Sequence, residues 1–182
     1  MGTSSRVAAR DARVTTLGVI GFAVALAAAS QVAIPVPGTP VPMTLQPLVV
    51  ALAGLWLGPV AGATSMVLYL VAGTAGLPVF APMGAPGFAR LFGPTGGYLW
   101  AYPVAAFVAG LIVNQRRTFA FRALAAAAAI AVVHLGGFLQ LLVLTGSAAQ
   151  AVALGAVPFI PLDLVKVLAA AALSSTTPRA TA

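Results

Sequence analysis

The sequence contains no cysteine and very little charge. Of its 182 residues, 6% are charged, two are acidic and one is a histidine. The absence of cysteine excludes disulfide scaffolds, thiol catalysis and cysteine-ligated zinc or iron–sulfur centres. One histidine and two carboxylates are too few to form a metal cluster, so no metal site is expected.

Apolar residues make up most of the chain. They account for 61% of the sequence, and the mean hydropathy is +1.07. A soluble domain carries roughly a quarter charged residues, so a water-soluble globule is excluded. The net charge of +7 comes from nine Lys and Arg residues that form no stripe with interleaved aromatic residues. Nucleic acid is therefore not an expected partner, and the charge instead indicates orientation in a membrane.

Long intervals without charge predict an all-α integral membrane protein with six transmembrane helices. One span needs about 20 apolar residues, and residues 14–89 contain no Asp, Glu, Lys or Arg. Proline and glycine divide this interval into three apolar segments, and three more follow it. The second and third segments are short and can cross only with tilt or local thinning of the bilayer. The expected spans are 14–34, 45–57, 60–72, 98–113, 123–144 and 157–173.

The distribution of arginines predicts how the spans are oriented. Six spans place both termini and the loop after the fourth span on one side, which is cytoplasmic by the positive-inside tendency. That side receives seven of the nine basic residues, namely Arg6, Arg10, Arg13, Arg116, Arg117, Arg122 and Arg179. The outer side receives the proline-rich stretch 35–42, a long structured loop over 73–97 and a turn at 145–150. The expected organisation is a cytoplasmic segment 1–16, a membrane domain 17–174 and a cytoplasmic tail 175–182.

The N-terminus has an alternative interpretation. Three arginines ahead of an apolar run that ends in small residues are also typical of a cleaved secretory signal. Removing this span would break the charge symmetry of the other segments, so an uncleaved first helix is expected.

Asp163 and Lys166 are the strongest functional signal in the sequence. Each costs about 2.5 to 3.5 kcal/mol at the middle of a span. They lie at i and i+3 and therefore project from one face of the last helix. Pro158 and Pro161 favour a helix start just before them, which puts Asp163 in the first turn. The pair is either a structural ion pair near the outer interface or a ligand site, and we expect the ligand site because intramembrane charges facing a bundle interior are usually functional.

Four further polar residues are candidates for a functional role. Arg90 either covers an outward-facing pocket or lies at the membrane interface. Thr44 and Gln46 either orient a ligand or serve in helix capping and interhelical hydrogen bonds. His134 is expected to be a hydrogen-bonded packing residue, with a proton relay as the alternative.

No motif for catalysis or ATP hydrolysis is present. The glycine-rich segment 93–97 lacks the Gly-Lys-Ser/Thr of a P-loop, and the single lysine follows Val165. This segment is instead expected to turn the chain into the fourth helix. An intramembrane enzyme would need Ser30 or Ser65 as its nucleophile, and neither lies in a recognisable motif.

Five ordered motifs closely resemble the BioY family, the biotin-specific substrate-binding (S) components of energy-coupling factor (ECF) transporters. The resemblance covers about residues 17–174. The motifs are Pro42-Met43-Thr44-Leu45-Gln46, Leu55-Trp56-Leu57-Gly58-Pro59, Gly76-Leu77-Pro78-Val79-Phe80, Gly93-Pro94-Thr95-Gly96-Gly97-Tyr98 and Pro158-Phe159-Ile160-Pro161-Leu162-Asp163-Leu164-Val165-Lys166.

The resemblance implies a six-helix transporter subunit, not an enzyme, that captures biotin from outside in the bacterial cell membrane. Biotin is then a substrate, and no cofactor is expected. The implied partners are a transmembrane coupling subunit and two cytoplasmic ATPase subunits, and a homo-oligomer is left open. The alternative function is a self-sufficient secondary transporter of a small carboxylate-bearing solute, proton-coupled through Asp163 or His134.

The resemblance also implies roles for individual residues. The turn 81–86 departs from the family, which is usually richer in glycine there, and its prolines are expected to stiffen the loop. An Ala-x-x-x-Ala contact with the coupling partner corresponds to Ala25 and Ala29. The expected substrate-binding residues are Asp163, Lys166, Arg90, Thr44, Gln46 and Tyr98.

Overall fold

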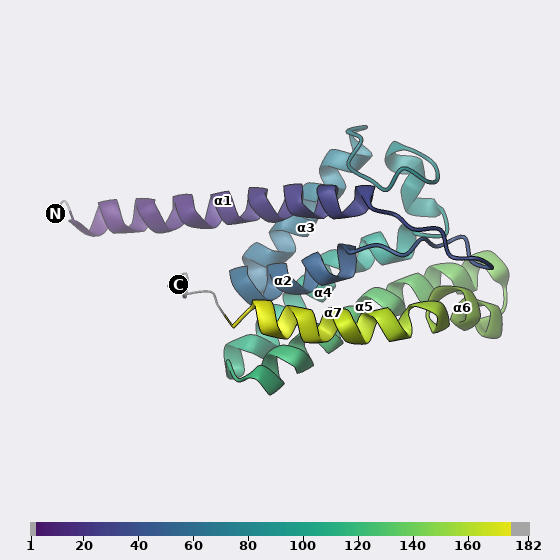
Figure 1. Cartoon of the computed structure of the whole chain (residues 1–182). Coiled ribbons are helices and arrows are strands. Elements are labelled where there is room, and N and C mark those ends of the chain that lie inside the picture. Colours follow the sequence, from purple (N-terminus) through teal and green to yellow (C-terminus); the bar gives the residue numbers. More distant parts are fainter. Residues whose placement is uncertain (1–2, 176–182) are drawn as a thin grey trace.

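A computed structural model describes residues 3–175, with side chains from residue 12 onward. Within that range the chain folds into seven α-helices and two 3₁₀ helices, without a strand (Figure 1). An isolated β-bridge between Ile34 and Met43 closes the proline-rich loop. Arg179 and the rest of the tail beyond residue 175 lie outside the described residues. The helices are α1 (Thr3–Gln31), α2 (Gln46–Leu57), α3 (Pro59–Thr74), η1 (Gly87–Phe92), α4 (Gly96–Gln115), α5 (Phe119–Thr145), α6 (Ala148–Gly155), η2 (Val157–Phe159) and α7 (Ile160–Leu173).

The helices follow the expected apolar segments, with differences at the ends. Helix α1 begins at Thr3, so residues 3–16 continue the first apolar helix. Residues 148–155 form α6, where a turn had been expected over 145–150, because Ser147 caps this helix by accepting from the backbone N–H of Gln150. The loop over 73–97 contains η1, a short helix that the sequence pattern did not predict.

Four helical units of the described chain are long and apolar enough to cross a membrane. They are Ala12–Gln31, Gly96–Gln115, Phe119–Thr145 and Ala148–Leu173, the last of which joins α6, η2 and α7. Helices α2 and α3 are apolar but shorter, with 12 and 16 residues. Gly58 separates them with a φ of 80°, a left-handed value that favours glycine, and Pro59 then occupies the first turn of α3.

Glycines bring α2, α3 and α4 into close contact. A Cβ atom at Gly54 would collide with the backbone carbonyl of Ala106, and one at Gly110 would collide with the backbone nitrogen of Pro59. These small residues therefore serve internal packing. The turn between α2 and α3 consequently lies beside Gly110, near the end of α4 at Gln115.

The loops that follow α1, α3 and α5 lie at one end of the bundle. In Figure 1 the first turns of α1, the last turn of α7 and the α4–α5 turn lie toward the left, whereas the loops that follow α1, α3 and α5 lie toward the right. A side-chain bond ties the loop after α1 to α6, since Thr39 Oγ1 donates to the Leu154 carbonyl at 2.6 Å. This loop-covered end contains the candidate site.

Candidate functional site

A pocket lies under the loops, between the helix ends at the loop-covered end of the bundle. Its walls come from α2, α3, α4, α5, α7, the two 3₁₀ helices and the loops that precede α2 and η1. The cavity volume is about 50 Å³. The lining combines apolar and aromatic side chains with a few convergent polar groups, as small-molecule sites do. All six residues expected to bind substrate line it, namely Asp163, Lys166, Arg90, Thr44, Gln46 and Tyr98.

Asp163 and Lys166 form a buried ion pair on the pocket wall. Helix α7 begins at Ile160, so Asp163 occupies its first turn, as Pro161 and the preceding sequence predicted. The Lys166 ammonium donates to Asp163 Oδ1 at 2.8 Å. The two residues are only 6% and 4% exposed, so both charges face the pocket interior instead of the bulk solvent.

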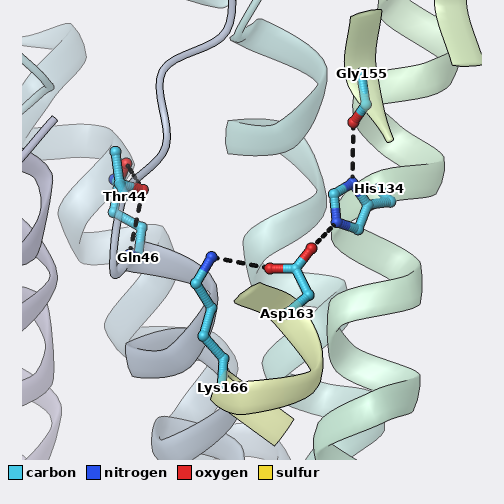
Figure 2. A network of polar contacts seen from close by, with 6 residues as sticks. All are labelled: Thr44, Gln46, His134, Gly155, Asp163 and Lys166. Atoms are coloured by element: carbon cyan, nitrogen blue, oxygen red, sulfur yellow. Dashed lines mark hydrogen bonds and ion pairs between the residues drawn. The ribbon is translucent and has the colours of Figure 1, made fainter. Parts of the chain in front are cut away.

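His134 of α5 contacts the second oxygen of the same carboxylate. Its Nε2 lies 2.5 Å from Asp163 Oδ2, and its Nδ1 lies 3.1 Å from the Gly155 carbonyl oxygen (Figure 2). Tyr98 Oη donates to that carbonyl as well, at 2.7 Å. His134 is therefore hydrogen-bonded, as expected, but its partner is the carboxylate of the candidate site.

Thr44 and Gln46 form the wall that faces Lys166 (Figure 2). Gln46 Nε2 donates to Tyr69 Oη at 2.9 Å, which joins α2 to α3. Thr44 Oγ1 accepts from the Gln46 backbone N–H at 3.3 Å and donates to Gln46 Oε1, also at 3.3 Å. The interhelical contact considered for these residues is thus present, and the same side chains line the pocket.

Arg90 is buried, with 3% exposed, and does not lie on the surface of its loop. Its Nη2 donates to the Ala81 carbonyl at 2.8 Å, and its Nη1 donates to the Met83 carbonyl. Gly84, with a φ of 107°, lies where a Cβ atom would collide with Arg90 Nη1. Burial lowers the pKa of the Arg90 guanidinium from its ordinary value. The turn 81–86 therefore holds the arginine that lines the pocket.

Aromatic residues that were not predicted to bind the substrate complete the pocket. Tyr69, Phe80, Tyr102 and Phe159 all line it. The Tyr69 and Phe80 rings meet edge to face, with centroids 5.4 Å apart. Tyr69 and Tyr102 could have been predicted from the sequence, because the hydroxyl of a tyrosine inside an apolar helix needs a hydrogen-bond partner.

Four of the residues considered from the sequence lie outside the pocket. Ala25 is exposed and Ala29 is half-buried on α1, and a Cβ atom at the neighbouring Gly21 would meet nothing within 4 Å. Ser30 and Ser65 donate to the backbone carbonyls of Val79 and Gly62. The face of α1 that carries Gly21, Ala25 and Ala29 is therefore open. Both serine hydroxyls are used in hydrogen bonds to backbone carbonyls.

Comparisons with known proteins give matches over most of the chain. The family model described as the BioY family matches residues 3–182. The probable biotin transporter BioY of Pyrococcus horikoshii is 42% identical over 127 residues, which cover 70% of this chain and 74% of that protein. The biotin transporter BioY of Thermotoga maritima is 36% identical over 141 residues, which cover 78% and 83%. The crystal structure of the S-component for biotin from an ECF-type ABC transporter shares the fold, with a TM-score of 0.81 at 23% identity over 96% of this chain and 92% of that chain.

Proposed function

The chain belongs to the BioY family, and on that premise we propose that it captures biotin for uptake as the membrane-embedded substrate-binding subunit of an ATP-driven ECF transporter. The relatives are named as biotin transporters, and none of those named above is an enzyme. The observation that carries the proposal is the pocket, in which α7 and η1 bring a carboxylate, an ammonium and a guanidinium together under the loops.

The pocket chemistry suits biotin. Biotin offers a ureido ring with two N–H donors and a carbonyl, and a valerate chain that ends in a carboxylate. Asp163 supplies an acceptor for the N–H groups, and Lys166 and Arg90 supply cationic donors. The side chains of Thr44, Gln46 and Tyr98 supply neutral polar contacts around them. No cofactor is required for this binding, and biotin is the substrate.

The membrane topology that we propose has six spans. It counts the short helices α2 and α3 together with the four long helical units. The position of the α2–α3 turn beside Gly110, near the inner end of α4, supports two crossings by these helices. Both termini and the arginines at 116–122 are then cytoplasmic, and the loop over 73–97 is outside. In this proposal the segment 1–16 and the tail 175–182 flank a membrane domain 17–174 in a bacterial cell membrane.

Partners must supply the energy for uptake in this proposal. The sequence has no P-loop, so a transmembrane coupling subunit and two cytoplasmic ATPase subunits provide ATP hydrolysis. The open face of α1 around Ala25 and Ala29 is the contact that we propose for the coupling subunit, because small residues permit close helix approach. Nucleic acid has no role, and a homo-oligomer remains compatible with this arrangement.

Uptake of radiolabelled biotin tests this proposal. In proteoliposomes, we expect accumulation only when the chain is combined with the coupling and ATPase subunits and supplied with ATP. The Ala25→Leu/Ala29→Leu double variant should still bind biotin but lose accumulation, since the bulky side chains block the helix contact. Accumulation by the chain alone, driven by a pH gradient, would contradict the proposal and support a secondary transporter.

A further inference from the structure

The side chain of Tyr98 connects three helices at one wall of the pocket. Tyr98 lies in the first turn of α4, and its ring lies beside Gly137 of α5. Its hydroxyl donates to the carbonyl of Gly155, the last residue of α6, at 2.7 Å. Figure 2 shows this carbonyl pointing toward His134, whose ring meets that of Tyr98 edge to face with centroids 6.1 Å apart. Tyr98 is 7% exposed and lines the pocket, so the position of its ring decides where this wall lies.

Two glycines leave the space that the tyrosine occupies. A Cβ atom at Gly137 would overlap the outer ring atoms of Tyr98, namely Cζ, Cε1 and Cε2. A Cβ atom at Gly155 would lie 2.6 Å from Tyr98 Oη, which is closer than Cβ atoms come to other heavy atoms. Neither glycine has a positive φ, so the fold needs their small size and not their backbone freedom. The space between Gly137 and Gly155 is therefore a slot for the tyrosine, the tyrosine slot.

The surroundings of the tyrosine slot are closely packed on the side away from the pocket. Helices α4 and α5 are in backbone contact beside Tyr98, since a Cβ atom at Gly97 would overlap the Gly136 carbonyl oxygen. Leu141 is 1% exposed, and its Cδ1 would lie 2.5 Å from a Cβ atom at Gly155. Close-packed interiors respond to the addition of even one methyl group. A methyl group in the slot would therefore push the Tyr98 ring toward the space that is open beside it, the pocket.

We propose that Gly137 and Gly155 are positioning residues for the substrate, because they hold the Tyr98 ring back and so set how large a ligand the pocket admits. The inference rests on the proposed function and adds to it the residues that determine the size of the pocket. A ring displaced into the pocket would occupy ligand space and lose its hydrogen bond to the Gly155 carbonyl. Both effects weaken ligand binding, although neither glycine itself lines the pocket.

Calorimetry of biotin binding to paired variants tests the inference. Gly137→Ala should weaken the affinity roughly tenfold or more, the size that corresponds to overpacking by one methyl group. Tyr98→Leu removes Cζ, Cε1 and Cε2, the three atoms that the added methyl group would meet, and lowers the affinity by itself because a pocket contact is lost. Adding Gly137→Ala to Tyr98→Leu should then cause little further loss, because the two side chains no longer compete for the same space.

Gly136→Ala is the matched control, because it makes the same change one residue earlier on α5. Its Cβ atom would collide first with the Gly97 carbonyl oxygen and with Ala101 Cβ of α4. Its effect on affinity should therefore be the same with and without Tyr98→Leu. Equal relief of Gly136→Ala and Gly137→Ala by Tyr98→Leu would overturn the inference, because a shorter side chain would then loosen the whole bundle.

Gly155→Ala provides a second test that does not depend on the folding of Gly137→Ala. Its Cβ atom would meet the Tyr98 hydroxyl, which Tyr98→Phe removes while it keeps the ring. We expect Gly155→Ala to weaken biotin binding roughly threefold to tenfold, as overpacking at the tip of the side chain would. In the presence of Tyr98→Phe, Gly155→Ala should cause a clearly smaller loss.

The outcomes separate this inference from the function on which it rests. Wild-type affinity in both glycine variants, or losses that persist in full when Tyr98 is shortened, would overturn the inference and leave the proposed function intact. A folded wild-type chain that binds no biotin would contradict the proposed function. Thermal unfolding would then decide on the tyrosine slot, since Gly137→Ala should lower the unfolding temperature less with Tyr98→Leu than without it. Equal losses of unfolding temperature would overturn the inference.

Discussion

Individual charges in the pocket are stabilised by one another. The Asp163 carboxylate accepts from the Lys166 ammonium through one oxygen and lies against His134 with the other. A buried charge without a partner is strongly destabilising, whereas a paired and hydrogen-bonded charge can be kept inside a membrane protein. The pair therefore holds an acceptor and a cation side by side, where a ligand with both kinds of polar group can bind.

Neutralising the carboxylate is expected to weaken ligand binding. Asp163→Asn keeps the shape of the side chain but leaves Lys166 without its counter-charge and the ligand N–H groups without a charged acceptor. Loss of a hydrogen bond to a charged group costs about 1.5 to 3 kcal/mol, so we expect roughly a 10- to 100-fold weaker affinity for biotin in calorimetry. Asp11→Asn, which removes the other acidic residue of the chain, is the control and should bind as wild type does. Equal affinity in the two variants would contradict the site.

The sequence predicted some of these residues and not others for a physical reason. Asp163 and Lys166 could be predicted because a charge inside a span is costly wherever its neighbours lie. The bond between His134 and Asp163 joins residues 29 positions apart, and that between Gln46 and Tyr69 joins residues 23 apart. Such pairings depend on which helices pack together, and an apolar helix gives little sign of that because lipid and protein neighbours are equally apolar.

At the scale of elements, the loop after α3 is a folded cover whose own backbone holds a buried arginine. The carbonyls of Ala81 and Met83 accept from Arg90. Two residues before Ala81, the Val79 carbonyl accepts from Ser30 of α1 at 2.6 Å. The sequence predicted a structured loop from its prolines, but neither η1 nor the hydrogen bonds that Arg90 makes, because both depend on backbone groups brought together by the fold.

Gly84→Ala should disturb this cover and leave the helices intact. An added Cβ atom would collide with Arg90 Nη1, and the φ of 107° is unfavourable for alanine. We expect a roughly threefold to tenfold weaker biotin affinity, because displacing the arginine disrupts hydrogen bonds to a charged group. Gly38→Ala is a matched control, since it has a φ of 84° but nothing within 4 Å of its added Cβ atom. Equal losses in both variants would show that backbone strain, and not the displaced arginine, causes the effect.

At the scale of the whole molecule, the breaks between helices could be predicted more accurately than their ends. Proline interrupts a helix through its own backbone, whatever the rest of the fold does. The sequence therefore predicted breaks at Gly58-Pro59 and in the proline-rich stretch 35–42, and the structure has both. Helix α6 was not predicted, because the prolines at 158 and 161 placed the start of the last span after it. Six spans remain a prediction, since α2 and α3 are shorter than the other four units.

Single cysteines can test the six-span topology, because the chain has no cysteine of its own. Ala85→Cys lies in the loop that six spans would put outside, so it should react with a membrane-impermeant maleimide on intact cells. Arg117→Cys and Val60→Cys should react only after the membrane is opened, because six spans put both on the cytoplasmic side. The original sequence, without cysteine, is the control for background labelling. Reaction of Val60→Cys from outside, or from neither side, would contradict two crossings by α2 and α3.

The central claim is that this chain binds biotin in the pocket that contains Asp163 and Lys166. Isothermal titration calorimetry of biotin into the detergent-purified chain tests it most directly, with Lys166→Ala measured beside the wild type. We predict saturable binding to the wild type and an affinity at least about tenfold weaker in the variant, because a charged donor is lost. A folded wild-type chain that binds no biotin, or a variant that binds as tightly as the wild type, would contradict the account.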